Sequence, residues 1–139
     1  MFENSFSANE QPLDSIRHER LRRLRAYWEA ERLPARWLVY EKLRPEQIAY
    51  VLADVAVLER SGGGGELVLQ VRLAGEAIRM EGLGFVRGKS SAEFRPSWFR
   101  DHMIESCRNV FERASPVYAL VTLRYEGGAY PYEQLFLPV

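Results

Sequence analysis

The sequence has little of what several classes of protein require. Its 139 residues include one cysteine, Cys107, which excludes an internal disulfide framework and any metal site built from several cysteines. No apolar run approaches the roughly 20 residues that a membrane-spanning helix needs. The first residues, MFENSFSANEQPLDS, lack the basic segment and apolar stretch of a secretory signal. We therefore expect a cytoplasmic protein that does not associate with membranes.

An excess of charge of either sign is also absent. Nineteen Lys and Arg residues balance nineteen Asp and Glu residues, so the formal net charge is zero. No overall field therefore attracts nucleic acid or an anionic membrane surface. Hydrophobic residues make up 47% and charged residues 27%, which is ordinary for a globular protein. The length suffices for one domain with a sizeable core.

The stretch GLGFVRGKS, Gly82 to Ser90, resembles a phosphate-binding loop at first sight. Such a loop needs four residues between its first glycine and the Gly-Lys pair, whereas three or five intervene here. It also opens a long helix, and Pro96 stops any helix that begins at Ser90 within two turns. We expect a turn segment rather than a nucleotide site.

The start of the chain predicts an arm followed by a helix. Residues 1–13 are polar without periodicity, and we expect a flexible arm. Residues 14–33 show helical periodicity, with Asp14 or Ser15 as the cap and an end before Pro34. The other face of this helix is rich in arginine. Its Glu–Arg pairs favour a solvated surface, and a basic helix that touches nucleic acid is the alternative.

The middle of the chain predicts a hairpin. The segment WLVY, residues 37–40, fits either a short strand or a buried loop. Residues 44–54 read as a short helix with Pro45 in its first turn. The apolar runs 54–60 and 66–74 flank four consecutive glycines, so they predict two strands and a flexible turn. Alternation in the second run predicts one buried face.

The last third predicts a long helix and a second hairpin. SSAE at 90–93 matches a capping box. Apolar residues recur at helical spacing from Ser97 until Pro116. Strands follow at 117–126 and 129–139, around a Gly-Gly turn. This order of elements predicts an antiparallel α+β domain with helices packed on one face of the sheet.

Several segments, taken in order, are similar to the PAS domain family, in its compact bacterial type with an N-terminal RLRAYW helix. They are LRRLRAYWEAERLPAR, RPEQIAYVLADVAVLE, LQVRLAGEAI, VRGKSSAEF, ERASPVY and EQLFLP. The resemblance spans Arg17 to Val139 and implies a PAS-like domain at 34–139 behind the amphipathic helix. It also implies that the glycine-rich turn segment forms one wall of an internal cavity.

Two features depart from the PAS pattern. Glu76 follows Gly75 where the family has a small polar residue. A PAS sheet has five strands and the sequence predicts four, because the fifth strand follows LFLP and the sequence stops at Val139. Three explanations stay open: the sequence is cut short, residues 37–40 or a second copy fill the gap, or the strand assignment is wrong.

The resemblance implies a sensory or protein-interaction module rather than an enzyme. It would bind a small apolar ligand or dock a signalling protein, form a homodimer, and pass a signal through a shift of the sheet or the flanking helix. A cavity filled by its own side chains, in a domain that only docks, is the alternative. The expected dimer contacts are the exposed sheet face and Leu21, Leu24 and Trp28. The expected cavity residues are Val71, Leu73, Phe94, Trp98, Met103, Cys107, Val121 and Leu123.

Residues for catalysis and cofactor binding are few. His102 lies roughly 100° from the centre of the apolar face of its helix, which disfavours a haem ligand. Cys107 lies on that apolar face and lacks the NCRF setting of flavin-adduct PAS domains, so we expect a buried core thiol. We assign no catalytic residue, no metal ligand and no cofactor. The alternatives are an enzyme with an NTF2-like cone-shaped pocket and a nucleic-acid adaptor that uses the arginine-rich helix.

Overall fold

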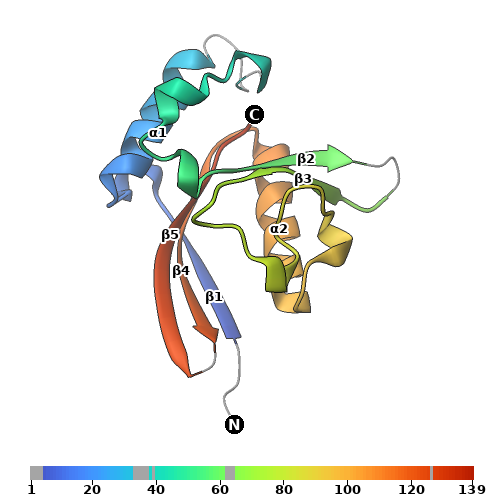
Figure 1. Cartoon of the computed structure of the whole chain (residues 1–139). Helices are drawn as coiled ribbons and strands as arrows, with labels where there is room; N and C mark the ends of the chain where they lie inside the picture. Colours follow the sequence, from blue (N-terminus) through green and yellow to red (C-terminus); the bar gives the residue numbers. More distant parts are fainter. Residues whose placement is uncertain (1–4, 33–37, 39, 62–64, 126) are drawn as a thin grey trace. The chain divides into compact units, whose positions relative to one another are not determined.

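The computed structural model describes residues 5–32, 38, 40–61, 65–125 and 127–139 (Figure 1). In these residues two α-helices and five strands form an α+β fold with antiparallel pairing throughout, which confirms the predicted fold class. The chain divides into two compact units. One comprises Met1–Leu43 with Asn109–Val139, and the other comprises Arg44–Arg108.

The first unit contains a three-stranded sheet in the order β1-β4-β5. Strands β4 (Val117–Tyr125) and β5 (Gly128–Phe136) form a hairpin. Gly127 has a φ of 81°, which glycine adopts without strain, so it turns the chain tightly between the strands. The hairpin predicted around the Gly-Gly turn is confirmed.

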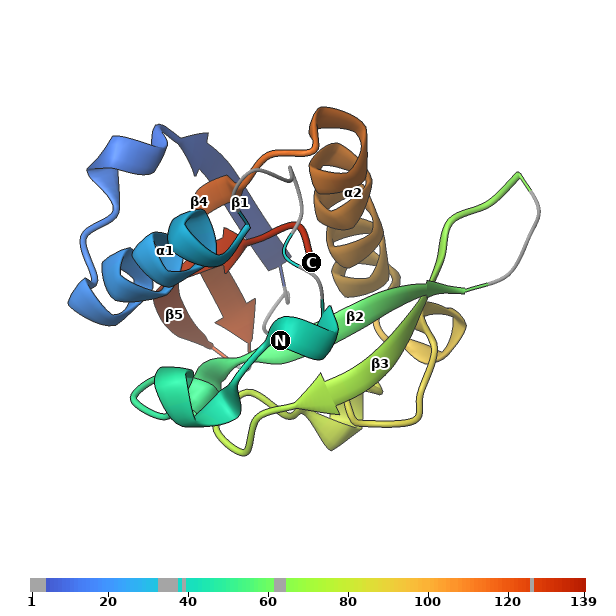
Figure 2. The ribbon, with the colours of Figure 1, turned by 90° about the horizontal axis from the view of Figure 1, so that it is seen from above.

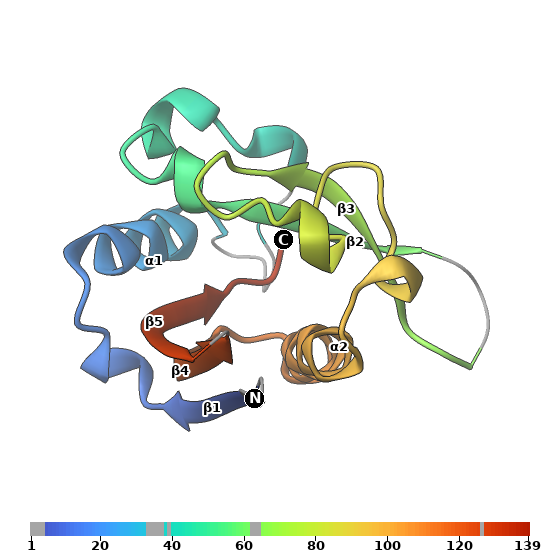
Figure 3. The ribbon, with the colours of Figure 1, turned by 60° about the horizontal axis from the view of Figure 1, so that its bottom comes forward.

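Strand β1 (Ser5–Gln11) lies on the other side of β4 and pairs with it antiparallel (Figure 3). The sequence predicted a flexible arm over residues 1–13, and the structure instead places a strand in it. Most side chains of β1 are exposed, so no apolar alternation marks this strand in the sequence. Its partners, residues 118–124, are also far away along the chain, beyond the reach of local reasoning.

The hydrogen-bonding sides of these strands follow from Pro131 in β5. Pro131 lies opposite Thr122 and has no N–H to donate, so the two form a non-hydrogen-bonded pair. The backbone N–H and C=O of Thr122 therefore point away from β5, towards Ser7 of β1. The same alternation directs the backbone groups of Asn9 to β4 and those of Ala8 to the outer edge.

Helix α1 (Glu19–Glu31) is shorter than the predicted range of 14–33, although it ends before the proline as expected. Leu13–Ser15 forms a separate 3₁₀ turn. Between turn and helix the chain buries Ile16, which requires a break in the helical path. His18 caps α1, because its Nδ1 accepts the backbone N–H two residues later at 3.2 Å. This replaces the cap expected three or four residues earlier.

The second unit contains a two-stranded sheet of β2 (Ala56–Ser61) and β3 (Val68–Ala74), which lie side by side (Figure 2). The predicted strand pairing is confirmed. Glycines 62–64 of the predicted turn lie outside the described residues. Leu69 and Val71 are buried, as the alternation in the sequence predicted.

The helix predicted at 44–54 is replaced by two 3₁₀ turns, Pro45–Ile48 and Leu52–Asp54. The chain at the second turn runs very close to Gly75. A Cβ atom on Gly75 would lie 2.3 Å from the carbonyl oxygen of Ala53, so only glycine fits there. This close approach needs a tight turn that brings the backbone to the end of β3, which a regular α-helix would not provide.

Only Leu38 and Tyr40 of the segment 37–40 belong to the described residues. Leu38 is buried, and its N–H donates to the carbonyl of Pro138 at 3.3 Å. Tyr40 begins a 3₁₀ turn. The described part of this segment is thus a buried loop and a turn, not a strand. Residues 137–139, where the sequence analysis placed the end of the last strand, are not in a strand.

The glycine-rich segment covers the outer edge of β3. The N–H of Gly88 donates to the carbonyl of Val71 at 2.9 Å, and the N–H of Val71 donates to the carbonyl of Lys89 at 2.8 Å. The hydroxyl of the buried Ser91 accepts the N–H of Leu69 at 3.0 Å. These bonds explain the stretch that resembled a phosphate loop, because it turns the chain and completes the edge of the sheet.

The predicted capping box and long helix are both present. The N–H of Ser90 donates to the carboxylate of Glu93 at 2.9 Å, and Ser90 caps the short turn in return. Helix α2 spans Ser97–Arg113, as the periodicity predicted. Its buried positions are those of the predicted apolar face: Phe99, Met103, Cys107 and Val110.

Candidate functional site

Six of the eight predicted cavity residues belong to the second unit and come from β3, the turn before α2, and α2 itself. Four of them are buried and two are half-buried. Alternation on β3 and helical spacing on α2 therefore identified positions in a shared apolar core. The buried ones are Val71, Phe94, Met103 and Cys107, and the half-buried ones are Leu73 and Trp98.

Three phenylalanines form the aromatic centre of this core. The ring centroids of Phe85 and Phe94 are 5.7 Å apart, those of Phe85 and Phe99 are 5.8 Å apart, and those of Phe94 and Phe99 are 5.6 Å apart. These separations are typical of edge-to-face packing, in which the rings fill the space between them. The predicted cavity residue Phe94 is thus in contact with two other rings.

The sequence analysis did not find Phe85. It lies in the glycine-rich segment, where no periodicity marks a buried residue. Gly84 turns the chain there with a φ of 76°, and the N–H of Phe85 donates to the carbonyl of Met80 at 2.9 Å. A single large aromatic residue among glycines was the available signal, because such a side chain seldom stays fully exposed.

Cys107 is a core residue, as the sequence predicted. Burial raises the pKa of its thiol to about 12. The thiol is therefore protonated at neutral pH, and it is neither a nucleophile nor a ready metal ligand.

The other two predicted cavity residues, Val121 and Leu123, belong to the first unit. Val121 is buried and Leu123 is half-buried, both on β4. That all eight residues line one cavity stays a prediction.

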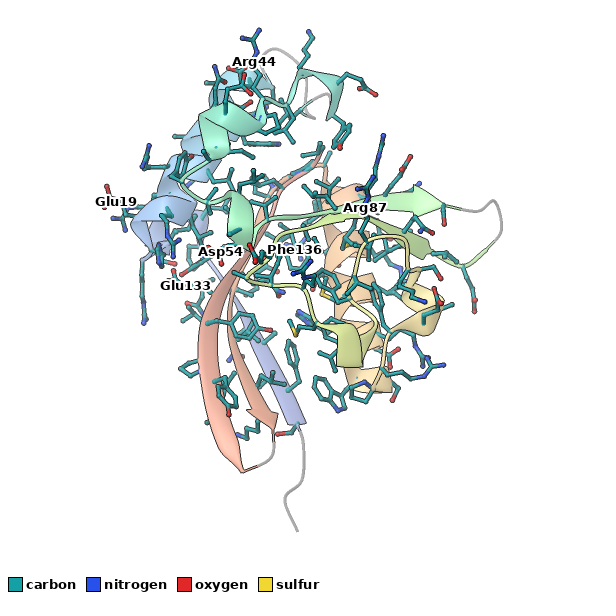
Figure 4. The ribbon with its side chains drawn as sticks, in the orientation of Figure 1. Glu19, Arg44, Asp54, Arg87, Glu133 and Phe136 are labelled. Carbon is teal, nitrogen blue, oxygen red and sulfur yellow. The ribbon has the colours of Figure 1, made fainter. Side chains whose placement is uncertain are left out.

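The first unit has its own polar centre at Glu133 of β5. One carboxylate oxygen accepts the N–H of Arg17 at 2.9 Å and the N–H of His18 at 3.1 Å. The same oxygen accepts the hydroxyl of Tyr118, which is buried on β4. Figure 4 shows the Glu133 side chain on the side of β5 that faces the start of α1. Three donors on one oxygen anchor the entry of α1 to the sheet.

The charge at this centre is stabilised. Partial burial would raise the pKa of Glu133, but the hydrogen bonds from Tyr118 and from the N–H groups of His18 and Arg17 outweigh it and lower the pKa. Burial, together with donation to Glu133, raises the pKa of Tyr118. Glu133 is therefore ionised at neutral pH and accepts three hydrogen bonds on one oxygen, which suits a structural anchor rather than a proton-transfer residue.

The predicted dimer residues fall into two groups. Leu21 and Leu24 are half-exposed on α1. Trp28 is 2% exposed, donates its indole N–H to the carbonyl of Pro138 at 2.6 Å, and carries the Arg32 guanidinium 4.6 Å from its ring centroid. Its surface is used within the first unit, so Trp28 is not accessible to a second copy. The dimer prediction then rests on the two leucines and on the exposed sheet face.

The arginine-rich helix is partly engaged in local contacts. Arg22 donates to the carbonyls of Ile16 and Arg17, and Arg25 lies 3.3 Å from the carboxylate of Asp14. Such contacts favour the solvated amphipathic helix over a basic face held ready for nucleic acid.

Among the described residues no group of three or more His, Cys, Asp or Glu side chains could hold a metal ion. His102, the one candidate haem ligand in the sequence, is half-buried on α2. No helix in the described part of the chain is long and apolar enough to cross a membrane.

Comparison with known proteins supports the resemblance seen in the sequence. A family model with the description PAS domain matches residues 16–139, which cover the second unit and all of the first unit except residues 1–15. Neither the comparison with curated proteins nor the comparison with solved structures found a match. The family match spans most of the chain and begins one residue before Arg17, where the resemblance in the sequence begins. The chain belongs to the PAS domain family.

Proposed function

We propose that this chain is a sensory or protein-interaction module of a signalling system, and not an enzyme. PAS domains are in general modules of this kind, and the family match over residues 16–139 is the observation that carries the proposal. We further propose that it works in the cytoplasm as a homodimer, with Leu21 and Leu24 at the contact between copies.

The proposed ligand is a small apolar molecule that contacts the apolar core around Val71, Phe94 and Met103. Two observations support this. The core is lined by apolar and aromatic side chains, which suits an apolar ligand. Its thiol, Cys107, is protonated and chemically inert, so binding rather than covalent capture would be expected. The proposed signal is a population shift between two arrangements of the domain that bind the ligand differently.

Native mass spectrometry of the protein as purified from cells, with its absorbance spectrum, tests this proposal. A dimer with extra mass that disappears under denaturing conditions is the expected result, and the added mass begins to identify the ligand. A dimer without added mass reduces the proposal to docking alone. A monomer without added mass contradicts both the ligand and the dimer.

A substitution locates the ligand. Met103→Ala removes buried apolar contacts that the ligand would make, whereas Leu21→Ala removes a side chain from the surface of α1. The bound mass should fall with Met103→Ala and stay with Leu21→Ala. Retention of the ligand by Met103→Ala, or its loss in Leu21→Ala, would place the binding site elsewhere.

A further inference from the structure

Strand β1 is unusual because it is aligned with β4 along its whole length while its side chains are mostly exposed. Every residue from Ser5 to Gln11 lies opposite a residue of β4. Five of these seven side chains are exposed, and the half-buried ones are Phe6 and Gln11. The facing stretch of β4 is different, since Tyr118 and Val121 are buried. β1 therefore adds a strand to the sheet without adding much to its core.

The backbone hydrogen bonds hold β1 in a defined register. Because Thr122 directs its N–H and C=O to β1, residues Ser7 and Asn9 exchange hydrogen bonds with β4. Phe6, Ala8 and Glu10 direct theirs to the outer edge. A backbone that pairs at alternate residues, with few side chains buried, is how an extended peptide adds to the edge of a sheet.

Two side chains of β1, Glu10 and Phe6, occupy places on the first unit that favour a particular type of side chain. The carboxylate of Glu10 lies 2.7 Å from the guanidinium of Arg113, in the last turn of α2. Phe6 lies opposite Leu123, on the same face of the sheet as Glu10, with the small Ala8 between them. β1 thus presents an aromatic residue, a small residue and a carboxylate at alternate positions to the first unit.

The contacts of Glu10 and Phe6 determine the register of β1 on β4, but they contribute little to the stability of this pairing. Both side chains of the Glu10–Arg113 pair are 48% exposed, and ion pairs this exposed add little stability. The exposed side chains of β1 bury little apolar surface. Segments with few buried contacts and exposed backbone hydrogen bonds open most readily in a native protein.

We propose that the edge of β4 towards β1 is a docking edge for an extended acidic segment of a partner protein, and that β1 occupies this edge in cis until such a segment displaces it. The partner segment runs antiparallel to β4. It carries a large apolar residue at the place of Phe6, a small residue at that of Ala8, and a carboxylate at that of Glu10 to meet Arg113. Displacement links partner binding to release of the residues before α1. The proposal rests on the proposed function, because it takes docking as the way in which the domain passes its signal.

The charge of Arg113 argues for an acidic segment as the occupant. Its guanidinium has a specific partner in Glu10, and that bond is made by a strand whose side chains are mostly exposed. A segment without a carboxylate at this place leaves the guanidinium without that partner. β1 itself therefore serves as a template for the partner sequence.

The test uses a fluorescein-labelled synthetic peptide with the sequence of residues 3–13 and measures its binding to the full chain by fluorescence anisotropy. Asn9→Pro in the chain removes an N–H that points to β4, whereas Ala8→Pro removes one that points outwards and is the matched control. We expect Asn9→Pro to bind the peptide about tenfold or more tightly than the wild-type chain, because it raises the fraction of chains with a free edge. Ala8→Pro should bind like the wild type.

The charge contact is tested in the same assay. A peptide with Glu10→Arg should bind Asn9→Pro more weakly than the original peptide does. Adding Arg113→Glu to the chain should restore the binding of that altered peptide, because the ion pair is then re-formed with its charges exchanged. Equal binding of both peptides to both chains would contradict the proposed role of Arg113.

Other outcomes overturn the proposal directly. A folded Asn9→Pro chain that binds the peptide no better than the wild type would show that β1 does not cover a docking edge. Weaker binding by both proline variants would show that the peptide adds to the outer edge of β1. Light scattering that finds a wild-type dimer and an Asn9→Pro monomer would assign the edge to β1 of a second copy. Circular dichroism of each variant checks that it is folded.

Phe6→Ala is the second variant, since it leaves every backbone hydrogen bond possible. It should also strengthen peptide binding, by less than Asn9→Pro. This assay is independent of the ligand and dimer measured by mass spectrometry. A chain can therefore fail the peptide test and keep its ligand, or bind the peptide and carry none, so the two proposals fail separately.

Discussion

Two strands of the molecule, β3 and β4, each have an edge covered by a distant segment, but the two covers are built differently. The segment on β3 uses backbone bonds from Gly88 and Lys89 together with the buried hydroxyl of Ser91. The segment on β4 is β1, whose side chains are mostly exposed. A segment fixed by buried side chains is part of the core, whereas one held mainly by backbone hydrogen bonds can be exchanged without disturbing the core.

The cover of β3 depends most on Gly84. Its φ is 76°, and a Cβ atom there would lie 2.5 Å from the carbonyl oxygen of Glu93. Gly84→Ala should lower the free energy of unfolding by about 2–3 kcal/mol, from backbone strain and the clash together. Gly82→Ala is the control, because nothing lies within 4 Å of a Cβ atom at that position. Urea unfolding measures the free energy of unfolding of both variants. Equal losses would contradict the close approach of Gly84 to the carbonyl of Glu93.

Ser91 should have the next largest effect. Ser91→Ala leaves the buried N–H of Leu69 without its acceptor at 3.0 Å, which should cost about 1–3 kcal/mol in unfolding free energy. Ser7→Ala, on the exposed side of β1, should change it by less than about 0.5 kcal/mol. Similar losses of unfolding free energy in the two variants would contradict the difference between the segment that covers β3 and the strand that covers β4.

The first unit also contains a contact fixed by partly buried groups, which is the set of hydrogen bonds between Glu133 and the start of α1. Substitution of Glu133 tests whether such a contact contributes more than an exposed ion pair. Glu133→Gln should lower the free energy of unfolding by about 1 kcal/mol at neutral pH, since a neutral amide accepts hydrogen bonds less strongly than a carboxylate. Glu59→Gln, at an exposed ion pair on β2, should change it less.

The same anchor predicts a pH dependence. The folded-state pKa of Glu133 is below its ordinary value of 4.5, so its contribution is present above the unfolded-state pKa. That contribution is lost as the pH falls through the folded-state pKa. Thermal unfolding at neutral and acidic pH should therefore differ less in Glu133→Gln than in the wild type. An unchanged difference would contradict the anchor.

Amide hydrogen exchange compares the two covers without any substitution. The N–H of Thr122 is bonded to β1, and the N–H of Val71 is bonded to the carbonyl of Lys89. Thr122 should exchange about tenfold faster or more, because β1 opens without the core. Asn9→Pro should speed the exchange of Thr122 and leave Val71 unchanged. Equal protection in the wild type would mean that β1 opens only when the whole unit unfolds.

Patterns with a local period were predictable from the sequence. The helical spacing from Phe99 to Val110 located α2, alternation located β3 and β4, and the Gly-Gly turn located β5 as the second strand of a hairpin. The capping box at 90–93 was readable because its two partners are three residues apart. These elements bury one face each, so their hydrophobic pattern carries the information. The core positions Val71 and Met103 lie on these patterns, whereas Phe94 lies on neither and came from the family resemblance.

Other features could not be predicted from the sequence, because the residues that determine them are distant along the chain or become neighbours only in the folded structure. β1 is polar and becomes a strand only because the edge of β4 is available to it. His18 caps α1 because the buried Ile16 and the bonds to Glu133 fix where the helix begins. Phe85 is buried because the turn at Gly84 directs it to two other rings.

The sequence alone determined the α+β class, the long helix, both hairpins and the family, since each depends on residues that are close together or on their order. The tertiary structure decided how edges are covered and where polar groups find partners. The physical reason is that an unpaired backbone N–H or C=O can be satisfied by any segment of the chain that reaches it. The sequence does not mark that segment, and in this protein it was β1 for β4 and residues 88–91 for β3.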